Sequence, residues 1–92
     1  MIGIYMQTKM SVEQYQEINA RVLDAQLDIT GLVMHCAFGE SGSVALFDVW
    51  ESKAAFEAFA AHLGPIFAAL GVEPVAPDFV EMIDYQAAPL HP

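Results

Sequence analysis

The sequence predicts one small α+β domain in which two helices cover one face of an antiparallel sheet. Three observations lead to this fold class. Four short segments have the apolar pattern of strands, two longer segments repeat apolar residues at a helical period, and their order along the 92 residues is β-α-β-β-α-β. This order is the split βαβ, or ferredoxin-like, arrangement. No repeat or linker divides the chain, so we expect residues 1–86 to form the domain and residues 87–92 to be a disordered tail.

The first strand and the first helix occupy residues 1–25. Residues 1–6 alternate apolar side chains with others, which predicts a strand. Ser11 and Gln14 have the spacing of a capping box at the start of a helix. The apolar stripe of that helix follows at helical spacing and consists of Val12, Tyr15, Ile18, Val22 and Ala25.

A β-hairpin comes next. Gly31 restarts the chain, and residues 32–38 and 43–51 read as two strands. Residues 39–42, Gly-Glu-Ser-Gly, predict a four-residue loop between them.

The second helix begins at the cap residue Ser52, and its apolar stripe consists of Phe56, Phe59, Ala60 and Leu63. Gly64 and Pro65 should kink or restart this helix, because proline lacks the donor that an interior position needs. Gly71 should end it in the left-handed conformation. Residues 72–77 then form an extended connection, and residues 78–85 the last strand.

The central hairpin is apolar on both faces. One predicted face carries Leu32, Met34, Cys36 and Phe38, and the other carries Val33, Ala37, Val44 and Leu46. Strands that are apolar on both faces are usually buried on both faces, but two helices cover only one. The chain is also 55% hydrophobic and only 16% charged. We therefore expect a homodimer in which a second copy covers the open face of the sheet.

The charge pattern excludes several classes of partner. The net charge is −9, and the only bases are Lys9, Arg21 and Lys53. Three scattered bases make no patch for nucleic acid or for an anionic membrane, so a small neutral or apolar ligand suits the chain better. The single cysteine, Cys36, forms no internal disulfide, and the sequence has no signal-peptide pattern and no apolar run long enough to cross a bilayer. These features predict a cytoplasmic protein.

One face of the hairpin combines three side chains that could perform chemistry. A four-residue loop sets Phe38 opposite Ser43, which makes His35 and Asp48 diagonal neighbours on that face, and Trp50 continues it. A histidine oriented by a carboxylate can act as a general base, for example toward a phenol. The alternative is a buried His–Asp pair that serves the structure alone.

A pocket between sheet and helices would use these residues together with the second helix. Its predicted walls are His35, Asp48, Trp50, Phe56 and Phe59. If the face bearing His35 instead meets the partner subunit, the opposite face lies under the helices. Tyr5 and His62 are further pocket candidates, with ordinary strand and helix-end roles as their alternatives. The histidines lack the spacing of a metal site, so we expect no metal.

The chain also resembles a known group of proteins. The segments GLVMHCAF (31–38), VALFDVWES (44–52), AFEAF (55–59) and HLGP (62–65) are similar to antibiotic-biosynthesis-monooxygenase-like members of the dimeric α/β-barrel superfamily. This resemblance implies a dimeric barrel. The superfamily includes cofactor-independent oxygenases, heme-degrading enzymes, small cyclases and many members with no known role. The heme-degrading branch uses an Asn on the first strand and a Trp near the second helix. Here the first strand has no Asn and Phe59 takes the Trp position, so we expect no heme.

Two functions follow from these observations. The first is binding of a small aromatic or quinol-like molecule, with cofactor-independent monooxygenase activity in which His35 and Asp48 are the catalytic residues. The alternative is a non-enzymatic ligand-binding or structural dimer.

Overall fold

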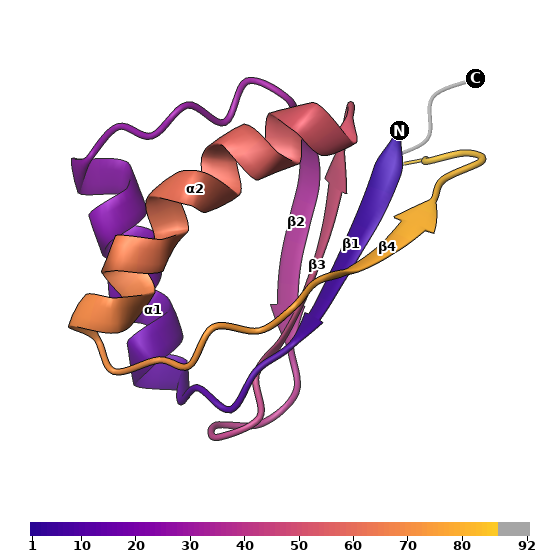
Figure 1. Ribbon diagram of the computed structural model, residues 1–92. Helices are drawn as coiled ribbons and strands as arrows, with labels where there is room; N and C mark the ends of the chain where they lie inside the picture. Colours follow the sequence, from indigo (N-terminus) through magenta and orange to yellow (C-terminus); the bar gives the residue numbers. More distant parts are fainter. Residues whose placement is uncertain (87–92) are drawn as a thin grey trace.

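The computed structural model describes residues 1–86, and it confirms the predicted order of elements (Figure 1). The predicted tail, residues 87–92, lies outside the described residues. Within the described part, no helix is long and apolar enough to cross a membrane. The elements are β1 (Ile2–Gln7), α1 (Val12–Asp24), β2 (Leu32–Phe38), β3 (Ala45–Trp50), α2 (Lys53–Ala69) and β4 (Asp78–Glu81).

The four strands form one antiparallel sheet in the order β2-β3-β1-β4. Both helices lie on the same side of this sheet (Figure 1). The buried apolar side chains, among them Ile4, Met6, Leu46 and Trp50, fill the space between the two layers. The fold is therefore the predicted ferredoxin-like arrangement, with one sheet face covered and the other open.

Local sequence signals fix both helix starts. The Ser11 hydroxyl accepts a hydrogen bond from the Gln14 amide at 3.0 Å, and Gln14 Oε1 accepts one from the Ser11 amide at 2.9 Å, which confirms the capping box. Ser52 Oγ accepts from the Ala55 amide at 3.1 Å at the start of α2. Gly71, with a φ of +69°, follows the end of that helix as predicted.

Gly64 and Pro65 were predicted to kink or restart α2, and the helix does not restart there. The helix runs unbroken from Lys53 to Ala69 with Pro65 inside it. Gly64 has no Cβ, which relieves the steric conflict that a proline imposes on the residue before it. Both residues are exposed, so water can reach the carbonyl group that loses its helical donor. The last strand is also shorter than predicted, because its pairing with β1 ends at Ile2 opposite Glu81.

The predicted hairpin register was wrong by two residues. Phe38 lies opposite Ala45 and not opposite Ser43, so six residues separate the paired strands. Within this loop the Ser43 amide donates to the Glu40 carbonyl at 2.9 Å, and the Val44 carbonyl accepts from the Thr8 amide at 3.1 Å and from Thr8 Oγ1 at 2.7 Å. Val44 thus belongs to the longer loop and bonds to the segment that follows β1.

A bulge in β2 changes which side one residue faces. The register shifts between Leu32 and Met34, so that Leu32 lies opposite Trp50 while Met34 lies opposite Val49. Leu32 thus joins the helix-covered face. The prediction that it shares a face with Met34 was wrong, because a bulge breaks the simple alternation of a strand.

The open face of the sheet remains largely apolar. It carries Tyr5, Met34, Cys36, Phe38, Phe47 and Val80, as the strand pairing shows. Phe38 and Val80 are each 50% exposed, and they lie on strands at opposite edges of the sheet. An apolar surface that extends from edge to edge is unusual for a face that meets only water.

Candidate functional site

The register of β2 and β3 brings His35 and Asp48 together. They are direct partners in the antiparallel ladder, and both side chains point toward the helices. His35 Nδ1 lies 2.5 Å from Asp48 Oδ1. A slip of two residues leaves His35 and Asp48 on the same face, and it makes them direct partners in place of the predicted diagonal neighbours.

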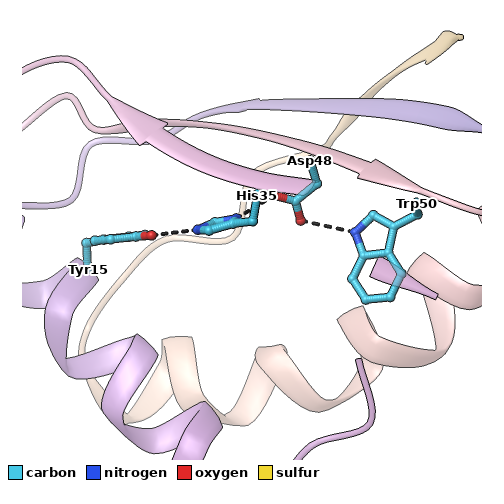
Figure 2. A network of polar contacts seen from close by, with 4 residues as sticks. All are labelled: Tyr15, His35, Asp48 and Trp50. Carbon is cyan, nitrogen blue, oxygen red and sulfur yellow. Dashed lines mark hydrogen bonds and ion pairs between the residues drawn. The ribbon is translucent and has the colours of Figure 1, made fainter. Parts of the chain in front are cut away.

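Asp48 is almost fully buried and both of its oxygens have partners. The residue is 6% exposed, and its second oxygen accepts a hydrogen bond from the indole nitrogen of Trp50 at 3.1 Å (Figure 2). Trp50 itself is 1% exposed. A buried carboxylate needs such partners, because burial without them is costly. The indole thus fixes the carboxylate that orients His35.

Helix α1 contributes a fourth residue to this cluster. The Tyr15 hydroxyl lies 2.5 Å from His35 Nε2, and the two rings lie end to end at an interplanar angle of 12° (Figure 2). The polar chain therefore runs from Tyr15 through His35 and Asp48 to Trp50. Sequence reasoning placed Tyr15 only in the apolar stripe of its helix. The available signal was that a tyrosine directed at the sheet usually needs a partner for its hydroxyl.

The Asp48 carboxylate raises the pKa of His35 above 6.5, chiefly through the hydrogen bond to Nδ1. Partial burial opposes this effect because it disfavours the charged ring. The hydrogen bond to Asp48 outweighs burial, so the pair favours the protonated imidazole. In the neutral ring, the carboxylate favours the tautomer with the hydrogen on Nδ1, which leaves Nε2 as an acceptor for Tyr15.

These residues line a cavity of about 270 Å³ between the sheet and the helices. Its polar lining consists of Tyr15, Asn19, His35, Asp48 and the indole of Trp50. The remaining wall is apolar and consists of Met6, Met10, Ile18, Val22, Leu23, Ile29, Leu32, Leu46, Phe56, Phe59, Leu63 and Phe67. A largely apolar cavity with a few convergent polar groups is the usual form of a small-molecule site.

The aromatic side chains of α2 enclose the end of the cavity at Trp50. The Trp50 ring lies 6.0 Å from Phe56, edge to face, and 5.2 Å from Phe59, centroid to centroid. Both phenylalanines therefore stand beside the His35–Asp48–Trp50 wall, as the sequence predicted for a pocket on this face.

Two predicted pocket residues lie elsewhere. Tyr5 points to the open face of the sheet, where its hydroxyl donates to Gln7 Oε1 at 2.9 Å and its ring lies 6.5 Å from Phe38. His62 is exposed on α2 and is absent from the cavity wall. Tyr5 alternates with the buried Ile4 and Met6, so its strand position alone directs it away from the helices.

Within residues 1–86, no three side chains of His, Cys, Asp or Glu come together as a metal site. His35 and Asp48 are a pair without a third such group.

Comparison with known proteins supports the fold. No protein-family model matches the sequence, and no curated protein matches it. Solved structures do match. A proposed antibiotic biosynthesis monooxygenase from Chloroflexus aurantiacus aligns with a TM-score of 0.65 at 10% identity, over 94% of this chain and 96% of that one. A second, from Deinococcus radiodurans, gives 0.61 at 13% identity, over 95% and 97%.

A protein of unknown function from Nitrosomonas europaea, NE2512, aligns with a TM-score of 0.63 at 20% identity, over 94% of this chain and 92% of that one. The chain has the fold of these proteins. The resemblance read from the sequence thus holds for the fold along nearly the whole chain. At identities of 10–20% this likeness shows the fold and transfers no activity.

Proposed function

We propose that the protein binds a small, mostly apolar aromatic molecule with an acidic hydroxyl, and oxidises it with molecular oxygen without a cofactor. The observation that carries this proposal is the His35–Asp48 pair in the wall of an otherwise apolar cavity. The pair would accept the proton of the ligand hydroxyl, and the aromatic wall would hold the ring. The shared fold with proposed antibiotic biosynthesis monooxygenases is consistent with this activity.

The chemistry needs only the substrate and oxygen. Loss of a proton to His35 leaves an electron-rich anion that can pass electrons to O₂. For an anthrone, whose enol tautomer is such an aromatic hydroxyl compound, the carbon that bears two hydrogens in the keto form gains one oxygen atom as a carbonyl group. The other leaves as water with the two hydrogens of that carbon, so the substrate supplies all four electrons. The protein supplies orientation and a base.

The reaction is tested by oxygen consumption with a panel of quinols, naphthols and anthrones. Product formed and O₂ consumed should match one to one, and His35→Ala should abolish turnover while the protein stays folded. Binding is followed separately through Trp50, the only tryptophan of the chain, whose fluorescence a ligand in this cavity should change. Binding without any oxygen consumption would leave a ligand-binding protein and reject the oxygenase.

We further propose that the protein acts as a homodimer joined through the open sheet face. The support is the apolar surface that includes Phe38 and Val80, which the helices of the same chain do not cover. Sedimentation at micromolar concentration should give about twice the mass of the 10.0 kDa chain. A stable monomer would contradict this assembly.

A further inference from the structure

Both ring nitrogens of His35 are occupied by the protein itself. Nδ1 faces Asp48 Oδ1 and Nε2 faces the Tyr15 hydroxyl, each at 2.5 Å. An imidazole has no third nitrogen, so His35 has no free position with which to meet a ligand. The next atom along the chain is the Tyr15 oxygen, and Tyr15 also lines the cavity. The group at the ligand end of the chain is therefore the phenol.

The direction of the hydrogen bond between Tyr15 and His35 depends on the charge of the imidazole. In the neutral ring with its hydrogen on Nδ1, Nε2 accepts from the Tyr15 hydroxyl, whose oxygen can then only accept from a ligand. In the charged ring, Nε2–H donates to the Tyr15 oxygen, and the hydroxyl hydrogen becomes free to donate to a ligand. One proton thus reverses what Tyr15 offers to the cavity.

We propose that Tyr15 relays a proton between a ligand hydroxyl in the cavity and His35. The ligand O–H bond breaks and its proton goes to the Tyr15 oxygen. In the same step the Tyr15 O–H bond breaks and that proton goes to His35 Nε2. Tyr15 ends neutral, the ligand becomes an anion, and the imidazolium is paired with Asp48. This inference rests on the proposed function and assigns the contact with the ligand to Tyr15.

The surroundings of the relay favour this role. Asp48 from β3 is the charged group that faces His35, and α1 presents Tyr15 and the neutral Asn19 to the same cavity. The residues that α2 directs at the cavity are Phe56, Phe59, Leu63 and Phe67, all uncharged. Within the described lining, the ligand anion would therefore be stabilised by a single cation, protonated His35, and the Tyr15 hydroxyl would lie between the two. The raised pKa of His35 agrees with this arrangement.

The test uses 4-nitrophenol, which absorbs visible light only as its phenolate. Occupancy is measured through Trp50 fluorescence and ionisation through visible absorbance, on the same samples across a pH series. The wild-type protein should lower the pKa of the bound probe. Tyr15→Phe should still bind the probe but reverse that shift by at least about one unit, which is about tenfold in the ratio of phenolate to phenol. Tyr5→Phe is the matched control, because it removes the same hydroxyl from the open face and should change neither reading.

The outcomes separate the relay from the proposed function. If Tyr15→Phe ionises the bound probe as well as the wild type does, His35 meets the phenol directly and the relay is wrong, while the binding site stands. If the wild-type protein binds neither 4-nitrophenol nor any phenol of the panel, the proposed function fails and the relay fails with it. If Tyr15→Phe binds 4-nitrophenol but leaves it un-ionised at pH values where the wild type ionises it, the relay is supported.

A second measurement avoids reliance on one variant. Protein in which all tyrosines carry a meta-fluorine keeps every hydroxyl, so its fold is preserved. The fluorine resonance of Tyr15, assigned by comparison with Tyr5→Phe and Tyr85→Phe samples, should shift as the bound probe ionises. A Tyr15 resonance that does not respond while the absorbance changes would overturn the relay.

Discussion

His35 lies directly opposite Asp48 in the β2–β3 ladder, with its Nδ1 2.5 Å from the carboxylate oxygen Oδ1. The carboxylate is buried, whereas the histidine side chain retains 33% of its exposure at the edge of the cavity. The buried carboxylate of Asp48 therefore orients a base, His35, that is partly accessible from the cavity. This asymmetry has consequences for stability as well as for ligand chemistry.

The first prediction concerns the pH dependence of folding. The folded pKa of His35 is raised above its ordinary 6.5, so this pair contributes stability that is fully present below about 6.5 and is lost as the pH rises through the folded pKa. The free energy of unfolding of the wild type should therefore fall over that interval. Asp48→Asn should remove this part of the slope. Urea unfolding at a series of pH values measures both, and equal slopes would contradict the pairing.

A second prediction separates the two oxygens of Asp48. Asp48→Ala removes the acceptor of the Trp50 indole N–H as well as the partner of His35. Because that indole is buried, the free energy of unfolding should fall by about 1–3 kcal/mol. Asp48→Asn retains one acceptor oxygen and should cost less. Urea unfolding at alkaline pH, where His35 is neutral in both variants, makes the comparison. A similar loss in both would mean that the Trp50 bond contributes little.

The pairing of His35 with Asp48 on one face could be predicted from the sequence because strand side chains alternate with a period of two. An error of two residues in the register leaves that parity intact. The register itself could not be predicted. The six-residue loop also contacts a distant segment, as in the bond of the Val44 carbonyl with Thr8, 36 residues away in the chain. A loop rule based on Gly39 and Gly42 contains no information about such long-range contacts.

Tyr15 illustrates a second limit of prediction from the sequence, namely the partner of a side chain that faces inward. Its place in the apolar stripe of α1 was readable from helical spacing, which puts it toward the sheet. Its contact with His35 depends on where along β2 the helix crosses, and side-chain packing between the layers decides that position. The sequence therefore predicts that Tyr15 faces inward, and the structure supplies the partner.

The third prediction tests the packing behind the site. A Cβ at Gly31 would lie 2.6 Å from the Cβ of Ala55 and 3.3 Å from the Trp50 ring. Gly31→Ala should therefore destabilise the protein by about 1–3 kcal/mol, since overpacking forces backbone or side-chain shifts. Ala55→Gly removes the opposing methyl group, so the double variant should lose less than the sum of the two single losses. Denaturant unfolding of the four proteins gives this coupling, and strict additivity would contradict the clash.

The last prediction concerns the open sheet face. Phe38 on β2 and Val80 on β4 are each 50% exposed, and they mark the two edges of the apolar surface. A stable dimer buries about 800 Å² per partner, and a carboxylate placed inside such an interface loses its hydration without gaining a partner. Phe38→Glu and Val80→Glu should each convert a dimer of about twice 10.0 kDa into a folded monomer in sedimentation. Ala61→Glu adds the same charge on the exposed side of α2 and should leave the mass unchanged. If the Ala61 variant also dissociated, added charge alone would be the cause, and if the two sheet variants stayed dimeric, the interface would lie elsewhere on the molecule.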